Sequence, residues 1–122
     1  MNWTTLLLAT VILAAFLMIS KGGQISAKDA AAYLKTGALV IDVRSPGEFH
    51  SGHLTNAINI PLDEIATTVP QRWPDKSQVL LLHCQSGMRS GMAKGKLKGL
   101  GYTNTFNLGS YGRAESILKQ TQ

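Results

Sequence analysis

Hydrophobic residues divide the chain into two unlike parts. Residues 1–20 carry no charged side chain, and the run from Trp3 to Ile19 is apolar apart from scattered threonines. A run of roughly 17–25 such residues is typical of a helix that spans a membrane. A cleaved signal peptide is the alternative, but no Lys or Arg precedes the run and no clean Ala-x-Ala site follows it. We therefore predict a single transmembrane anchor over residues 1–20, with membrane contact through residues 3–20.

The cations that flank this segment predict its orientation. Lys21, Lys28 and Lys35 follow the apolar run, and no cation precedes it. The positive-inside rule then places the C-terminal part of the chain in the cytoplasm. Export to the periplasm after cleavage of a signal peptide remains the alternative.

After a linker over residues 21–25, the pattern changes to alternating helices and strands over residues 26–122. Ser26, with Asp29 three residues later, predicts a capped helix over 27–35. Short apolar runs rich in branched residues are typical of buried strands in a parallel sheet. They cover residues 38–41, 57–60, 79–82 and 103–108.

Helical patterns separate and follow these strands. Ser45 precedes Pro46 at a first helical position, which predicts a short helix there. The others are expected over 62–69, closed by Pro70, over 90–100, and in a last segment that ends near Lys119. Strands alternating with helices in this way predict an α/β domain with a mostly parallel sheet.

Charge and cysteine content narrow the possible functions. The chain has 12 Lys and Arg against 7 Asp and Glu, a net charge of +5, and all of these charges follow residue 20. The single cysteine excludes an internal disulfide and a metal cage made of cysteines alone. We expect no metal, no nucleic-acid partner, and an attraction for small anions.

Cys84 occupies the position in the chain that is best suited to chemistry. It follows the strand over 79–82, begins a Ser/Gly loop and precedes a helix. Ligands of open α/β folds bind at the carboxyl ends of the strands, and a helix N-terminus there stabilises an anion. Arg89 adds a positive charge in the same loop. These surroundings favour a reactive thiolate with a lowered pKa over a buried structural cysteine.

Two segments of the sequence resemble the signatures of rhodanese domains. One runs from Asp42 to Pro61, and the other, Cys84-Gln85-Ser86-Gly87-Met88-Arg89-Ser90, is similar to their Cys-x-x-Gly-x-Arg-Ser active-site loop. The resemblance covers about residues 26–118. It implies a single-domain rhodanese fold, with a five-stranded, mostly parallel sheet flanked by helices.

The resemblance also implies a sulfurtransferase activity that needs no cofactor. Cys84 would take a sulfane sulfur from thiosulfate or a persulfide donor, a small anion, and pass it to a thiol, cyanide or a protein thiol. The residues implied to bind the substrate are Gln85, Ser86, Gly87, Met88, Arg89 and Ser90.

Residues outside the loop are expected to support the site or to shape its entrance. Asp42 and Arg44 lie at the end of the first strand, where we expect a supporting network of Arg44 with Asp42 or Glu48. Members of the family often have Gly-Gly and a Trp after the last strand, whereas this chain has Gly109-Ser110-Tyr111. The choice of acceptor is therefore not carried over, and Tyr111 is a candidate to fill the missing aromatic volume.

Two other functions compete with this interpretation. His83-Cys84 is suggestive of a cysteine phosphatase or an arsenate reductase, but tyrosine phosphatases have five residues between Cys and Arg, and here there are four. The shorter loop favours sulfur over a tetrahedral phosphate. The second competitor is a membrane-tethered sulfur carrier or interaction module without catalysis.

Overall fold

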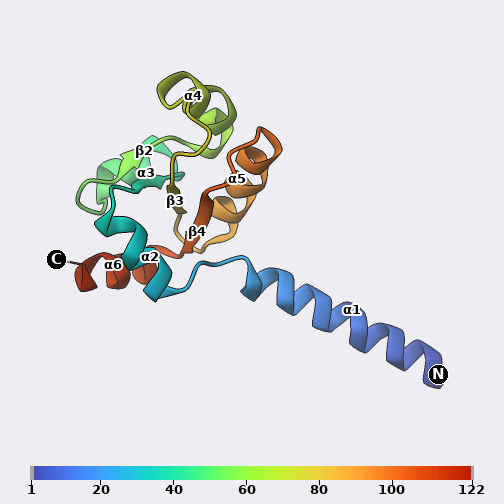
Figure 1. The fold of residues 1–122 in the computed structure, drawn as a ribbon. Helices are drawn as coiled ribbons and strands as arrows, with labels where there is room; N and C mark the ends of the chain where they lie inside the picture. The colour runs from blue at the N-terminus through green and yellow to red at the C-terminus, as the bar shows by residue number, and fades with distance from the viewer. Residues whose placement is uncertain (1, 122) are drawn as a thin grey trace.

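Four parallel strands form the centre of the domain, and helices cover both faces (Figure 1). The computed structural model describes residues 2–121, and it describes their side chains except those of residues 15–22. The elements in chain order are α1 (Trp3–Gly22), α2 (Ala27–Lys35), β1 (Leu39–Asp42), α3 (Pro46–Ser51), β2 (Ile58–Asn59), the 3-10 turn η1 (Leu62–Glu64), α4 (Ile65–Arg72), β3 (Leu80–His83), α5 (Met88–Gly99), β4 (Thr105–Gly109) and α6 (Tyr111–Gln120).

The sheet has the strand order β2-β1-β3-β4, and every neighbouring pair is parallel. The expectation of five strands is therefore wrong by one within the described residues. Gln24 forms an isolated parallel bridge to Asn107, and the Ile25 N–H donates to the Asn107 carbonyl at 2.9 Å. A fifth strand beside β4 is thus reduced to one bridge, because the chain on one side continues into α1 and on the other into α2.

Successive residues of the strands face two separate cores, as the two-residue period of a strand requires. Ile41, Leu80 and Leu82 pack toward α4 and α5. Val40 and Leu81 pack on the other face, toward α2 and α6. All four residues of β3 are buried, as expected for the apolar run predicted to form a buried strand over 79–82.

Local capping explains where α2 and α3 begin, and both beginnings were predicted. The Ser26 side chain accepts a hydrogen bond from the Asp29 N–H at 3.1 Å. At α3, Ser45 Oγ accepts from the Glu48 N–H at 3.3 Å, while Glu48 Oε1 accepts from the Ser45 N–H at 3.2 Å. This reciprocal capping box fixes the Glu48 side chain at the first turn of α3.

The helix predicted over 62–69 differs from the structure at both ends. Its first residues form η1, and α4 then continues through Pro70 to Arg72. A proline inside a helix removes one hydrogen bond, here the one to the carbonyl four residues earlier. The buried side chains of Ile65 and Val69 hold the helix against the core despite that loss.

The helix α1 extends away from the rest of the domain in Figure 1. Within the described part of the chain, no helix combines the length and the apolar character that a membrane crossing needs. The predicted anchor, its membrane contact and the localisation drawn from them are therefore wrong on this finding. The side chains of residues 15–22, including Lys21, lie outside the described residues.

Candidate active site

Cys84 lies between the carboxyl end of β3 and the N-terminus of α5. Its side chain is buried, and its N–H donates to the Gly109 carbonyl of β4 at 3.3 Å. The Gly87 N–H donates to Cys84 Sγ at 3.0 Å, and the Ser90 hydroxyl lies 3.5 Å from the same sulfur. The loop therefore curls around one sulfur atom and presents hydrogen-bond donors to it.

These donors change the acidity of the thiol. Burial raises the pKa of Cys84, but hydrogen bonds from the Ser90 hydroxyl and from the Ser90, Gly87 and Ser86 amides outweigh it, so the pKa lies below its ordinary value. The N-terminus of α5, a helix of 12 residues, begins at the same loop and favours negative charge there. The arrangement is thus suited to hold a thiolate, as the sequence predicted.

Gly87 allows the loop to close around the sulfur. It caps α5 with a φ of +95°, a conformation that side chains disfavour. A Cβ at this position would stand 3.3 Å from the backbone of Gly109 and 3.3 Å from Gln24 Nε2. The close approach of the loop to β4 therefore depends on glycine.

Arg89 does not offer a free positive charge. Its guanidinium pairs with the Glu48 carboxylate through two hydrogen bonds, of 2.6 and 2.9 Å. The guanidinium, followed by the Ser45 N–H, lowers the pKa of Glu48 to about 2, so the carboxylate is ionised throughout the neutral range. The pKa of Arg89 is raised, first by Glu48 and to a smaller extent by Cys84, so the guanidinium senses both groups.

The expected network of Arg44 and Asp42 is present below the loop. Arg44 Nη2 lies 2.8 Å from Asp42 Oδ2 in a buried ion pair, and it also donates to the Gly52 carbonyl at 2.8 Å. Arg44 Nη1 lies 3.5 Å from Gln85 Oε1, and its guanidinium stacks over the Tyr111 ring at 4.8 Å. Of the two partners predicted for Arg44, the structure selects Asp42, since Glu48 is bound to Arg89.

His83 is the buried neighbour of Cys84. Its Nδ1 lies 3.2 Å from the Cys84 carbonyl, while its Nε2 has no hydrogen-bond partner among the described residues and lies 3.7 Å from Asp42 Oδ2. Burial lowers the pKa of His83 despite the opposing effect of Asp42. His83 is therefore neutral at pH 7, and the Tyr111 ring packs against it edge-on.

Asn107 is a site residue that the sequence reasoning missed. It lies on β4, is 4% exposed, and accepts hydrogen bonds from the Ser90 hydroxyl at 2.7 Å and the Gly109 N–H at 2.8 Å. Its amide also donates to the Gly87 carbonyl at 3.0 Å. The signal available in the sequence was a polar amide inside an apolar strand, where a buried polar group needs partners.

The remaining predicted loop residues, Ser86 and Met88, are exposed. Ser86 forms an isolated bridge with Ser110, and the Met88 N–H lies 3.5 Å from Ser86 Oγ. Neither side chain is hydrogen-bonded to Cys84 among the described contacts. Among all the residues that the structure describes, no group of three or more His, Cys, Asp or Glu side chains could hold a metal ion.

Comparisons with known proteins point to one family. The sequence model described as Rhodanese-like domain matches residues 26–112. Thiosulfate sulfurtransferase PspE of Escherichia coli (strain K12) is 41% identical over 69 residues, which cover 57% of this chain and 66% of that protein. Thiosulfate sulfurtransferase GlpE of Pseudomonas entomophila (strain L48) is 30% identical over 90 residues, 74% of this chain and 81% of that protein. The match to the E. coli protein thus spans slightly less than two thirds of its length.

A solved structure shows the same arrangement of elements. The human single-domain sulfurtransferase TSTD1 superposes with a TM-score of 0.65 at 29% identity, covering 80% of this chain and 96% of that one. The similarity therefore extends over nearly all of a single-domain protein.

Proposed function

Because the chain belongs to the rhodanese-like domain family, we propose that it is a thiosulfate-type sulfurtransferase whose sulfur is carried by Cys84. The observation that carries the proposal is the ring of donors around Cys84 Sγ, with the Gly87 N–H at 3.0 Å and the Ser90 hydroxyl at 3.5 Å. Donors that stabilise a thiolate also stabilise a persulfide, whose charge lies on the outer sulfur.

The reaction has two sulfur transfers. The Cys84 thiolate attacks the outer sulfur of thiosulfate, an S–S bond forms, and the donor's own S–S bond breaks to release sulfite with the electron pair. An acceptor thiolate or cyanide then attacks the outer sulfur of the Cys84 persulfide. The acceptor leaves as a persulfide or thiocyanate, and the Cys84 thiolate is regenerated without any net proton transfer.

The charges of the site favour donors of low charge. Arg89 is paired with Glu48, and Arg44 is paired with Asp42, so neither guanidinium is free to neutralise a dianion. Amides of the loop and the N-terminus of α5 supply the uncompensated positive potential. We propose a persulfide of a small or protein thiol as the better donor, with thiosulfate as an assay substrate.

Two alternatives to a sulfurtransferase are a cysteine phosphatase and a sulfur carrier without catalysis. Four residues separate Cys84 from Arg89, one fewer than in the tyrosine-phosphatase pattern, which argues against phosphate chemistry. A sulfur-carrier or interaction module would differ from an enzyme by lacking turnover. Hydrolysis of an aryl phosphate at a rate comparable to sulfur transfer would support a phosphatase instead.

The direct experiment is intact-mass spectrometry of the full chain after incubation with thiosulfate or glutathione persulfide. We expect the mass to increase by one sulfur atom in the native chain and to remain constant in Cys84→Ser. Addition of cyanide should then remove the sulfur as thiocyanate, over many cycles with excess donor. A native chain that gains no sulfur from either donor would refute the proposal, and a single turnover would favour the carrier.

A further inference from the structure

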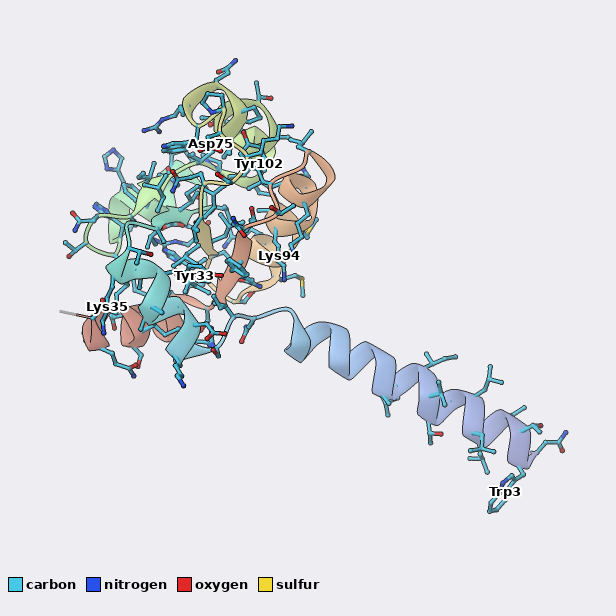
Figure 2. All side chains as sticks on the ribbon, in the orientation of Figure 1. Trp3, Tyr33, Lys35, Asp75, Lys94 and Tyr102 are labelled. Carbon is cyan, nitrogen blue, oxygen red and sulfur yellow. The ribbon has the colours of Figure 1, made fainter. Side chains whose placement is uncertain are left out.

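A groove of about 630 Å³ runs along α5, beside the loop that contains Cys84. Its walls include Gly23 and Gln24, where the chain leaves α1, and the segment from Ser86 to Met88. The α5 wall carries Met92 and Lys94. Figure 2 labels Lys94 on this helix, and its Nζ donates to the Gly23 carbonyl at 3.1 Å. The groove is therefore bounded on one side by the loop that holds the sulfur.

The apolar part of the groove is unusually exposed for this domain. Met88 is 74% exposed and Met92 is 55% exposed, and they lie one helical turn apart on α5. Outside α1, the large apolar side chains that are exposed among the described residues are these two and Leu100. Exposed apolar groups gathered at one place mark an interaction site, and methionine adapts to varied partners.

The charged residues that line the groove are both basic. Helix α5 contains Lys94, Lys96 and Lys98 and no acidic residue. None of the three lysines forms an ion pair among the described residues, and two of them, Lys94 and Lys98, line the groove. Burial, with a further contribution from nearby Lys98, lowers the pKa of Lys94. A negatively charged partner would offset the repulsion between Lys94 and Lys98.

One position that lines the groove is a glycine although the domain has room for a side chain there. Gly95 lines it, and a Cβ built there meets no atom within 4 Å. Glycine in a helix interior is less stable than alanine by about 1 kcal/mol. Packing inside the domain therefore does not require glycine here, and the bare position leaves room for the backbone of a partner.

We propose that the groove docks an acidic, amphipathic segment of the protein that accepts sulfur from Cys84. The inference rests on the proposed sulfurtransferase function and adds the class of acceptor. Acidic side chains would meet Lys94 and Lys98, apolar ones would meet Met88 and Met92, and a helix would lie along the groove as in other helix-in-groove complexes. Gly87 lines the groove and donates its N–H to the sulfur, so a partner docked there contacts the loop that holds Cys84.

The transfer in the complex is balanced. A thiolate of the docked protein attacks the outer sulfur of the Cys84 persulfide, and the Cys84 thiolate leaves as that S–S bond breaks. The partner departs as a persulfide, and no oxidant or reductant is consumed.

The test uses the full chain and two synthetic peptides. Both peptides are amphipathic helices with a leucine face and one cysteine; one has a glutamate face and the other a lysine face. The groove variant is Lys94→Gln/Lys98→Gln, and its matched control is Lys28→Gln/Lys35→Gln, which removes the same charge from α2, a helix packed on the opposite face of the sheet from α5. Fluorescence anisotropy measures binding, and the rate of sulfur transfer to the peptide thiol gives KM.

We expect the native chain to bind the glutamate peptide more tightly than the lysine peptide. The groove variant should bind it about fourfold more weakly and show a matching rise in KM, since each of the two exposed charges contributes about twofold. The control should behave as the native chain, and 0.5 M salt, at roughly a 4 Å screening length, should remove the difference. Transfer to 2-mercaptoethanol, a small neutral thiol, should be the same in every chain.

Two results would overturn the inference. One is equal binding of the glutamate peptide by the native chain and the groove variant. The other is a dimer in sedimentation that Met92→Gln dissociates, since a second copy would then fill the groove. Loss of transfer to 2-mercaptoethanol in the native chain would instead refute the sulfurtransferase function, while the anisotropy would still report on the groove.

Discussion

Replacing Ser90 with alanine tests whether the loop controls the acidity of Cys84. The Ser90 hydroxyl lies 3.5 Å from Sγ, and among the groups that lower the pKa of Cys84 it has the largest effect. Ser90→Ala removes this donor and keeps the backbone amides of the loop. The Gly109 N–H still satisfies Asn107 Oδ1 at 2.8 Å, so the buried amide does not lose all of its partners.

The expected magnitude follows from the geometry. A hydrogen bond to a charged group contributes about 1.5–3 kcal/mol. The Ser90 hydroxyl has one proton and also lies 2.7 Å from Asn107 Oδ1, so its bond to the sulfur belongs below that range. A value of about 1 kcal/mol corresponds to about fivefold in the thiolate fraction at a pH below the thiol pKa. A more basic thiolate is also more nucleophilic, with a Brønsted coefficient of about 0.4–0.5, which restores about twofold of the rate.

The assay is the rate of alkylation of Cys84 by iodoacetamide between pH 5 and 10, followed by intact mass. Ser90→Ala should react about two- to threefold more slowly than the native chain at low pH and about twofold faster on the high-pH plateau. The two curves should therefore cross. Ser86→Ala is the control, because its exposed hydroxyl makes no described hydrogen bond to Sγ, and its curve should follow that of the native chain.

The crossing separates a chemical role from damage to the fold. A Ser90→Ala curve that superimposes on the native one would show that the amides alone determine the acidity. A curve that falls by the same factor at every pH would show a general loss of accessibility or structure. Either result would refute the role given to the hydroxyl.

Three further predictions address the charges and backbone around the loop. Glu48→Gln frees the Arg89 guanidinium, so KM for the thiosulfate dianion should fall about threefold, with a smaller fall for an alkyl persulfide, which carries a single negative charge; an unchanged ratio of the two would contradict the pairing. His83 has a folded pKa below its unfolded value, so the free energy of unfolding should decrease as pH falls below about 6.5, by at most about 1.4 kcal/mol per pH unit. Urea titrations at pH 5–7 should show this slope flattened in His83→Gln. Gly87→Ala should destabilise the domain by about 1–2 kcal/mol and abolish persulfide formation, whereas Gly99→Ala, with open space around its Cβ, should not.

Local sequence patterns determined most of the elements of this domain. Ser26 and Ser45 are capping residues that act on the next helical turn, so their effect is readable within four residues of the chain. The apolar run before Cys84 and the Ser/Gly loop after it placed this cysteine at a strand end beside a helix N-terminus. These features depend on neighbours in the sequence, which is why composition and spacing were sufficient to predict them.

Contacts between distant segments were decided only by the tertiary structure. Arg89 and Glu48 are 41 residues apart, and Asn107 follows Ser90 by 17, so no local pattern relates either pair. The pairing of Arg89 changes the electrostatics of the site from a free cation to a neutral pair with backbone donors. The count of strands was likewise decided at a distance, because the residues around Gln24 form one bridge to β4 and no strand.

The sequence by itself therefore determined that Cys84 lies in a loop suited to hold an anion. Only the fold decided which groups supply the positive potential, because a charge acts through the partners that surround it in space, and those partners come from every part of the chain. The membrane anchor was likewise predicted from an apolar run alone, and among the described residues no helix has both the length and the apolar character that a crossing requires.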